Sequence, residues 1–282
     1  MSDDIPQTFS IGGDMKVSRL GFGAMRITGS GIWGWPADVD GAHKLLRRAL
    51  ELGIGLIDTA DAYGPEVSEY LIAEALRPYP DTLVIATKGG LVRGGPGDWT
   101  PDGRPEHLVR AVHNSLRRLG RDQIDLYQLH TIDDAVPLED SMGALKQMQD
   151  AGKIRHIGVS NFRVEHIERA RRIAEIVTVQ NRYSLADPKH EAVVNYCTEH
   201  GIGFIPWCPL DTGNLASEGR LRQIAQRYAA TPGQLALAWL LRRSPVMLPI
   251  PGTSSIEHLE ENTRAREIEL SERDFEAIRA DS

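Results

Sequence analysis

Short apolar segments alternate with amphipathic segments along almost the whole chain, and this alternation limits the possible folds more than any other feature. The apolar segments predict strands at 19–25, 54–58, 82–88, 124–130, 154–160, 176–180, 202–207 and 246–250. Helical spacing predicts helices at 39–52, 67–76, 105–119, 141–151, 164–174, 191–200, 219–228, 232–242 and 256–264. Strands that are apolar on both faces are typical of a parallel sheet covered by helices. Eight strand-then-helix units favour a closed (β/α)8 barrel, the TIM-barrel class, over an open sheet.

Two further elements flank these units. Residues 8–20 predict a β-hairpin that turns at Gly12-Gly13, and 272–280 predicts an additional C-terminal helix. The glycine- and proline-rich stretch 89–105 is expected to be a long loop at one mouth of the barrel. Because the sequence contains no linker or low-complexity segment, we expect a single domain over residues 1–282.

The composition argues against several classes of partner. Lys and Arg number 32 against 39 Asp and Glu, a formal net charge of −7, whereas non-specific nucleic-acid binding needs a basic face. No apolar run approaches the roughly 20 residues of a membrane span, and the polar start of the sequence is not that of a signal peptide. Cys197 and Cys208 are too few for a disulfide framework. We therefore expect a cytoplasmic protein with reduced thiols.

Polar side chains end most of the predicted strands. Asp58 ends the second strand, Lys88 the third and His130 the fourth, and Tyr63 lies in the turn after Asp58. The fifth, sixth and seventh strands end in Ser160-Asn161, Gln180 and Trp207. Catalytic groups of such barrels lie at the carboxyl ends of the strands, so we expect these side chains to meet at one mouth.

Each of the first four residues also has a structural explanation. Asp58 and Lys88 could form a stabilising ion pair, Tyr63 could pack, and His130 could be a satisfied core histidine. Four independent structural roles would not require one end of the barrel, however. A phenol has an ordinary pKa of about 10, and an adjacent ammonium lowers it. With a carboxylate that keeps Lys88 charged, the arrangement predicts that Tyr63 is a tuned general acid.

Six motifs occur in one order along the chain: DTADAYG from 58, ATK from 86, LYQLH from 126, GVSNF from 158, VQNRYS from 179, and PIPGTSS from 249 with LEEN from 259. Their order and spacing resemble the aldo-keto reductase family over nearly the whole chain. The resemblance implies a (β/α)8 barrel, no metal, and a nicotinamide cofactor that lies extended across the mouth. It also implies that Asp58, Tyr63, Lys88 and His130 form the catalytic tetrad.

The resemblance further implies a set of cofactor contacts. Ser160, Asn161 and Gln180 match positions that hydrogen-bond the carboxamide, and Trp207 matches an aromatic residue that stacks on the nicotinamide, although Trp207 could also be a core aromatic. The remaining implied contacts are Cys208, Pro209, Leu210, Gly252, Thr253, Ser254, His258, Glu261 and Asn262. The helix start at 252–255 suits a phosphate, although Ser255 could be an N-cap with no ligand.

Three positions depart from the family pattern. Gly252 and His258 stand where many members have a lysine and an arginine beside the 2′-phosphate, and Cys208 stands where a serine is common. Arg264 and Arg266, just downstream, could supply one missing charge. We therefore expect NADPH as the cofactor, with NADH use less suppressed than is usual in the family.

Three tryptophans suggest the substrate. Trp33 and Trp35 lie in the first strand-to-helix loop and Trp99 in the third, so we expect them to crowd the approach to Tyr63. Such a pocket favours a flat aromatic or apolar carbonyl compound, pyridoxal-like ones included, over an open-chain sugar. Each tryptophan could instead pack on its own loop. Arg26 and Arg93 could hold an anionic substituent or be solvated.

The leading hypothesis is NAD(P)H-dependent reduction of a small-molecule aldehyde or ketone to an alcohol. The hydride comes from the nicotinamide, Tyr63 is the general acid, and His130 orients the carbonyl. One alternative is a cofactor-binding regulatory protein with little turnover. Another is a barrel aldolase that uses Lys88 as a Schiff-base nucleophile, against which the paired Asp58 argues. The sequence assigns neither a physiological substrate nor an oligomeric state.

Overall fold

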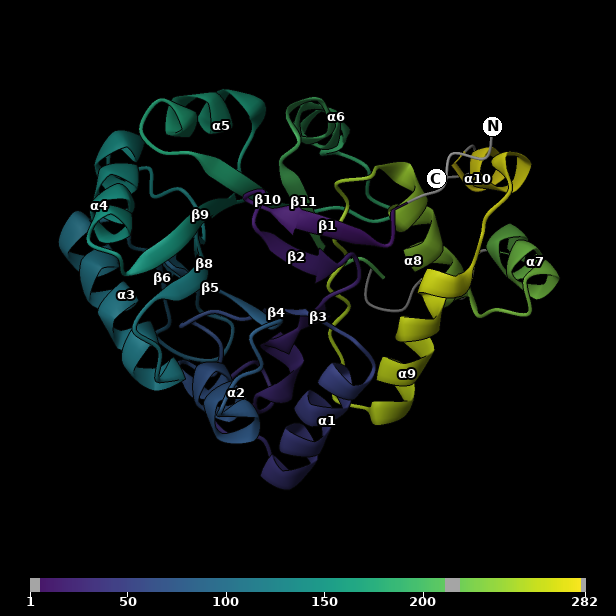
Figure 1. Ribbon diagram of the computed structural model, residues 1–282, viewed down its shortest axis with the longest axis horizontal. Helices are drawn as coiled ribbons and strands as arrows, with labels where there is room; N and C mark the ends of the chain where they lie inside the picture. The colour runs from purple at the N-terminus through teal and green to yellow at the C-terminus, as the bar shows by residue number, and fades with distance from the viewer. Residues whose placement is uncertain (1–5, 211–218, 280–282) are drawn as a thin grey trace.

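The fold is a barrel of parallel strands with helices around its outside (Figure 1). The computed structural model describes residues 6–210 and 219–279. Within them, one parallel sheet has the strand order β11-β10-β9-β8-β5-β4-β3. Its strands are β3 (Phe22–Gly23), β4 (Leu56–Asp58), β5 (Val84–Gly89), β8 (Ile124–Leu129), β9 (Ile154–Ser160), β10 (Ile176–Arg182) and β11 (Gly203–Trp207). The predicted (β/α)8 barrel is confirmed.

The helices form a ring in which sequence neighbours pack on one another. The ring helices are α1 (Val39–Glu51), α2 (Val67–Leu76), α3 (Pro105–Leu119), α4 (Leu138–Asp150), α5 (Val164–Arg171), α6 (Glu191–His200), α8 (Pro232–Arg243) and α9 (Ile256–Arg264). Helix α9 contacts α1, which closes the ring. Two extra helices, α7 (Gly219–Arg227) and α10 (Glu272–Arg279), lie outside it beside α8 (Figure 1). The predicted end of α10 at Ala280 lies outside the described residues.

The predicted eighth strand at 246–250 closes the barrel without forming a regular ladder. Phe204 of β11 makes two main-chain hydrogen bonds to this segment, of 2.8 and 2.7 Å. On the other side, Gly21 N donates to Pro249 O over 2.9 Å, just before β3. Because Pro249 has no N–H to donate, the segment bridges the two edge strands with few bonds and is not itself a regular strand.

The predicted N-terminal hairpin lies across the amino ends of the barrel strands. Strands β1 (Thr8–Ile11) and β2 (Met15–Ser18) pair antiparallel. Their inward side chains Ile11, Met15 and Val17 share one buried apolar cluster with interior residues of β4, β5, β8, β10 and β11. The hairpin therefore closes this end, and the carboxyl ends of the strands form the only mouth seen in the described residues.

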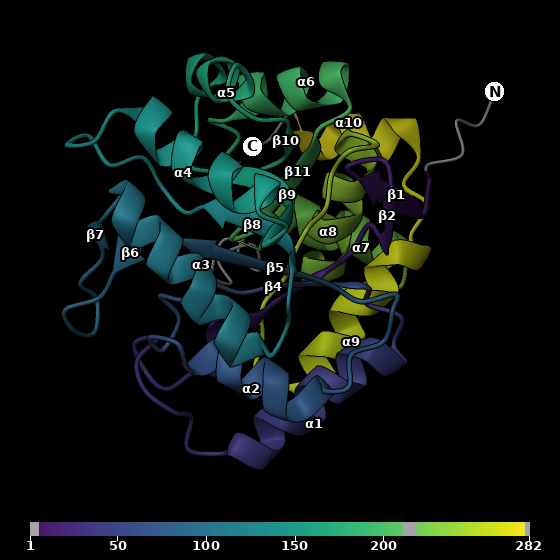
Figure 2. The same ribbon diagram turned by 60° about the vertical axis from the view of Figure 1, so that its left-hand side comes forward.

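The loop predicted at 89–105 contains a second, smaller hairpin. Strands β6 (Leu91–Val92) and β7 (Thr100–Pro101) pair antiparallel. Figure 2 shows β6 and β7 at the opposite end of the barrel from β1 and β2, projecting beyond β5. Helix α4 also begins at Leu138, three residues before the predicted start, because the acidic residues of its first turn carry no apolar periodicity.

No helix in the described residues is long and apolar enough to span a membrane.

Candidate active site

Lys88 is at the centre of the polar groups in the mouth. Its ammonium Nζ lies 2.7 Å from Asp58 Oδ2, 2.8 Å from the Thr59 carbonyl oxygen and 3.3 Å from the Tyr63 hydroxyl. Lys88 is 0% exposed and Asp58 2% exposed. Strands β4 and β5 are adjacent, with Asp58 paired with Ala86, so the two side chains enter the mouth side by side. The partner that a buried Asp58 needs is therefore Lys88.

The Asp58 carboxylate has further donors on its other oxygen. Gln180 Nε2 donates to Asp58 Oδ1 over 2.8 Å, and Gln128 Nε2 donates to the same oxygen over 3.2 Å. Together with Lys88, these side chains make three donors to Asp58, and each comes from a different strand of the barrel. A buried carboxylate with this many donors is held in one orientation, which fixes the position of the Lys88 ammonium and, through it, of the Tyr63 hydroxyl.

Burial dominates the electrostatics of Tyr63. Desolvation raises the pKa of the Tyr63 phenol above its ordinary value; the Lys88 ammonium acts to lower it and Asp58 to raise it. The net direction differs from the lowered pKa expected from the sequence, because the phenol is only 7% exposed. Burial likewise acts to lower the pKa of Lys88, but Asp58 and Tyr63 overcome this and leave that pKa raised. The arrangement holds a protonated phenol against a charged ammonium.

His130 enters the mouth from the end of β8. Burial, and then the charge of Lys88, holds the pKa of this imidazole well below its ordinary value, so the ring is neutral near pH 7. Its Nδ1 is buried and has no hydrogen-bond partner among the described residues. The His130 and Tyr63 rings lie edge to face with centroids 5.9 Å apart. A neutral imidazole beside a phenol can orient a carbonyl oxygen by hydrogen bonding.

Trp99 completes a group of three aromatic rings at this point. Its ring lies edge to face with Tyr63 at 6.4 Å and with His130 at 6.5 Å. Trp99 immediately precedes β7 on the small hairpin that rises from the mouth. Of the three tryptophans predicted to crowd the approach to Tyr63, Trp99 is the one that lines the cleft.

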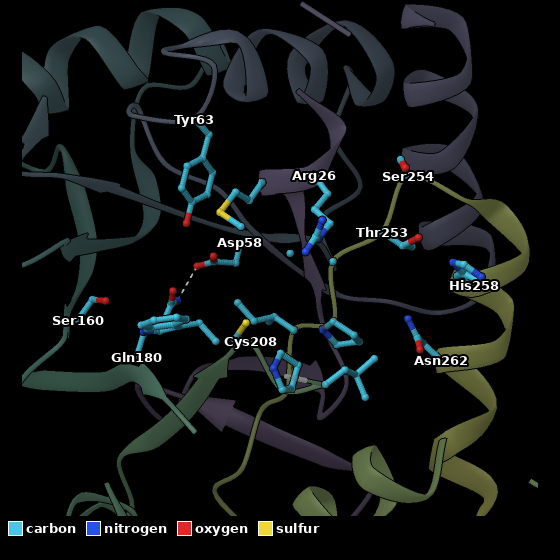
Figure 3. A pocket seen from close by; sticks show the side chains of 18 of the residues that line it. Arg26, Asp58, Tyr63, Ser160, Gln180, Cys208, Thr253, Ser254, His258 and Asn262 are labelled. Carbon is cyan, nitrogen blue, oxygen red and sulfur yellow. Dashed lines mark hydrogen bonds between the residues drawn. The ribbon is translucent and has the colours of Figure 1, made fainter. Parts of the chain in front are cut away.

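A cleft of about 870 Å³ runs from these rings along the mouth. Figure 3 shows Tyr63, Asp58, Gln180 and Ser160 at one end, and Ser254, Thr253, His258 and Asn262 at the other. All the predicted cofactor contacts line it: Ser160, Asn161, Gln180, Trp207, Cys208, Pro209, Leu210, Gly252, Thr253, Ser254, His258, Glu261 and Asn262. Their roles toward a cofactor stay predictions.

Asn161 and Trp207 are hydrogen-bonded to each other inside the cleft. The Trp207 indole Nε1 donates to Asn161 Oδ1 over 3.1 Å, and Asn161 Nδ2 donates to the His130 carbonyl oxygen over 3.1 Å. Asn161 has a φ of 62°, a left-handed conformation that asparagine tolerates better than most residues. The asparagine thereby links the loop after β9 to the ends of β8 and β11.

The structure places Trp33 and Trp35 outside the cleft lining, in contrast to the prediction. Trp35 is 49% exposed and its ring stacks on Tyr70 of α2, with centroids 6.4 Å apart. Trp33 forms an isolated β-bridge to Gly64. The guanidinium carbon of Arg93 lies 5.6 Å from the Trp33 ring centroid, so proximity in sequence to the mouth brought neither Trp33 nor Trp35 to Tyr63.

The arginines in these loops also differ from one another. Arg26 is exposed and lines the cleft, whereas Arg93 makes hydrogen bonds to main-chain carbonyls and is not among the lining residues. Arg266 donates to the Leu52 carbonyl oxygen over 2.9 Å, and neither it nor Arg264 lines the cleft. Arg264 and Arg266 are therefore not placed in this structure to supply the charge that the sequence allowed them beside a 2′-phosphate.

Sequence reasoning missed Gln128 and a buried ion pair behind the site. Gln128 lies two residues before His130, and residues two apart on a strand share a face, so the spacing could have identified it. Behind Lys88, Thr87 Oγ1 donates to Glu69 Oε1 over 2.6 Å, and Arg118 Nε lies 2.5 Å from Glu69 Oε2. These contacts between α2, α3 and β5 carry no local sequence signal.

Comparisons with known proteins identify the family of the chain. A model of the Aldo/keto reductase family matches residues 19–281. An uncharacterised oxidoreductase of Schizosaccharomyces pombe is 52% identical over 264 residues, which cover 93% of this chain and 86% of that protein. A pyridoxine 4-dehydrogenase of Escherichia coli is 44% identical over 271 residues, which cover 94% of both chains.

Solved structures show the same fold. A glycerol dehydrogenase from Gluconobacter oxydans superposes with a TM-score of 0.88 at 27% identity, covering 96% of this chain and 94% of that one. An aldo-keto reductase from Klebsiella pneumoniae, solved in complex with NADPH, has a TM-score of 0.82 at 29% identity, covering 96% of this chain and 93% of that one. With a family model over nearly its full length and close relatives over most of it, the chain belongs to the aldo/keto reductase family.

Proposed function

We propose that this protein is an NADPH-dependent carbonyl reductase in which Tyr63 gives the proton to the carbonyl oxygen. The observation that carries the proposal is the position of the Lys88 ammonium, fully buried and within hydrogen-bond distance of both Asp58 and the Tyr63 hydroxyl. A structural ion pair alone would not need a phenol as its third member. A carbonyl oxygen beside Tyr63 and His130 would meet one acid and one neutral hydrogen-bonding group.

Each residue of the site has a distinct role in the proposed reduction. Tyr63 is protonated at neutral pH and can donate its proton as charge develops on the oxygen. Lys88 then stands beside the phenolate that results and stabilises it, because the ammonium stays charged. Asp58 holds the ammonium in place, and His130, neutral, orients the carbonyl. The three surrounding rings exclude water from the oxygen, which strengthens these interactions.

The cleft fits an extended dinucleotide. One end offers amide and hydroxyl groups from Ser160, Asn161 and Gln180, which suit a carboxamide. The other end offers Thr253, Ser254 and the start of α9, where Ser255 caps the helix and backbone N–H groups favour an anion. When bound, the nicotinamide supplies the hydride. Related structures from Klebsiella pneumoniae contain NADPH or NADP, which supports the same cofactor here.

The proposed substrate is an aromatic aldehyde of the pyridoxal type. Trp99 lines the cleft beside Tyr63 and His130, and an aromatic ring can stack or meet it edge to face. The Escherichia coli relative is a pyridoxine 4-dehydrogenase, which agrees with this class. The aldolase alternative is disfavoured because a nucleophilic lysine must lose its proton, whereas the pKa of Lys88 is raised.

Turnover by a Tyr63→Phe variant tests the proposal. Wild type should reduce pyridoxal and benzaldehyde with NADPH, and Tyr63→Phe should lose about 100-fold or more in kcat, the usual contribution of a general acid. Tyr70→Phe, a surface tyrosine on α2, is the matched control and should keep wild-type kcat. Near-normal turnover by folded Tyr63→Phe would refute the role of Tyr63. NADPH binding without wild-type turnover on any carbonyl would instead favour a regulatory protein.

A further inference from the structure

We propose that Arg93 is a positioning residue that holds Trp99 against Tyr63 and His130 and thereby sets the preference of the carbonyl site for aromatic substrates. The inference rests on the proposed carbonyl reduction. Arg93 is half-buried at the end of β6, outside the residues that line the cleft. It would act through Trp99 rather than by touching the substrate.

The guanidinium of Arg93 connects three loops of the mouth. Its NH1 donates to the carbonyl oxygens of Ile32 and Ala62, both over 3.1 Å. Its NH2 donates to the Gly31 and Gly95 carbonyl oxygens, both over 3.3 Å, and its Nε to the Asp98 carbonyl oxygen over 2.8 Å. The acceptors come from the loop before α1, the loop before α2 and the hairpin of Arg93 itself.

Two of these bonds reach directly to functional neighbours. Ala62 is the residue before Tyr63, and Asp98 is the residue before Trp99. One side chain is therefore bonded to the main chain beside the proposed acid and beside the ring that faces it. Movement of Trp99 relative to Tyr63 would have to break these bonds or carry both loops together.

Arg93 also packs on the Trp99 ring itself. Its guanidinium carbon lies 3.7 Å from the Trp99 ring centroid, a contact that stabilises through cation–π attraction. Trp99 in turn lies edge to face with Tyr63 and His130. The indole is thus fixed between a cation and the two reactive side chains.

The same side chain stabilises an unfavourable backbone conformation. Ile32 has a φ of 57°, which is costly for a β-branched residue and persists only where surrounding contacts enforce it. The Arg93 bonds to Ile32 and to Gly31 supply such contacts. A lysine could not reproduce them, since it lacks the planar fork that serves several acceptors at once.

A rigid Trp99 should matter most for substrates that carry a ring. A flat substrate should bind more tightly when the orientation of the Trp99 indole is fixed before binding. A small aliphatic aldehyde contacts little of the indole and should be less affected. Loss of Arg93 should therefore raise KM for aromatic aldehydes while cofactor affinity stays constant. A residue that only stabilised the fold would not separate the two substrate classes.

The test is a double-mutant cycle between Arg93→Met and Trp99→Ala, measured with benzaldehyde and propanal. Arg93→Met should lower kcat/KM about tenfold or more for benzaldehyde, mainly through KM, and much less for propanal. The loss should disappear in the Trp99→Ala background. Arg93→Lys should recover only part of it, and the dissociation constant of NADPH should stay within about twofold. Arg104→Met, at an exposed arginine of the same loop, is the control.

Equal losses for both aldehydes, or an undiminished benzaldehyde loss in the Trp99→Ala background, would overturn the inference. A second readout is independent of turnover. In protein labelled with 5-fluorotryptophan, the Trp99 ¹⁹F signal, assigned with Trp99→Phe, should shift and broaden in Arg93→Met but not in Arg104→Met. If wild type reduced no carbonyl, the proposed function would fail while the ¹⁹F result still tested the positioning. An unchanged Trp99 signal in Arg93→Met would reject the positioning role.

Discussion

Gln180 on β10 donates a hydrogen bond across the barrel mouth to Asp58 on β4, with Nε2 and Oδ1 2.8 Å apart. The two strands are not neighbours in the sheet, so the bond spans the barrel interior. It couples a residue proposed to hold the cofactor to the carboxylate behind the proposed acid. Asp58 engages one of the two amide N–H groups of Gln180, which leaves the other N–H to donate to a ligand and the amide oxygen to accept from one.

Gln180→Glu should therefore make activity depend on pH. The new carboxylate would face Asp58 and lose the donor, and two close carboxylates raise one another's pKa. As pH falls from about 8 to about 6, protonation of Glu at 180 should restore the donor, so kcat/KM should rise while that of wild type stays flat. The pH profiles of kcat/KM decide this. Gln180→Glu with a profile parallel to that of wild type would contradict the coupling.

The pH dependence of wild type should follow Tyr63 alone. Burial raises the pKa of Tyr63, so its O–H form persists beyond the ordinary value of about 10. Reduction needs the O–H and should stay level through neutral pH, then fall as pH rises through that raised pKa. Alcohol oxidation needs the phenolate and should increase over the same range.

His130 should add no inflection to these profiles. Burial and Lys88 hold the pKa of His130 well below its ordinary value, so the imidazole is neutral on both sides of about pH 6.5. The check is kcat/KM for reduction between about pH 5.5 and 8. An inflection near pH 6.5 that is lost in His130→Gln would show that the ring becomes charged there.

Stability and activity should separate at the buried ion pair. Asp58→Leu leaves the Lys88 ammonium, 0% exposed, without its counter-charge and should cost about 3–5 kcal/mol in the free energy of unfolding. The double variant Asp58→Leu/Lys88→Met removes both charges and should recover most of that loss. Neither variant should reduce aldehydes. Denaturant unfolding measures the change in the free energy of unfolding, and NADPH oxidation measures the loss of aldehyde reduction. A double variant as unstable as the single one would exclude the uncompensated charge as the cause of the lost stability.

Arg26→Met should weaken binding of NADPH and NADH by the same factor. Figure 3 shows the Arg26 side chain in the middle of the cleft, between Asp58 and Thr253, where the pyrophosphate common to both cofactors is expected. Arg26 has no ion pair with any described residue, and a lost charge-assisted bond should raise both dissociation constants about tenfold. Arg26→Lys, which keeps the charge, should recover most of the affinity. Fluorescence titration measures both constants, and a loss confined to NADPH would place Arg26 at the 2′-phosphate instead.

The barrel and the location of the site could be predicted because both follow from periodic features. Strand ends in a parallel barrel meet at one mouth whatever the loops do, so Asp58, Lys88, His130 and Gln180 converge by topology. The eighth strand was less regular than predicted because Pro249 removes a donor that apolar periodicity does not register.

Loop side chains were not predictable on the same grounds. Trp35 and Trp99 have similar local contexts, near glycines and prolines, yet one stacks on Tyr70 and the other faces Tyr63. What separates them is contact between loops far apart in sequence, such as the Arg93 bonds to Gly31 and Ala62. A single sequence contains no periodic signal for such contacts.

The hairpin of β1 and β2 closes the barrel at the amino ends of its strands. Because Ile11, Met15 and Val17 fill the far end, the mouth is the one route from solvent to Tyr63 that the described residues leave, and the proposed cofactor and substrate would use it too. Under the proposed function, a proton given up by Tyr63 cannot be replaced from below while ligands cover it. Product and oxidised cofactor would then have to leave the mouth before solvent can reprotonate Tyr63, so product release would precede reprotonation in each catalytic cycle.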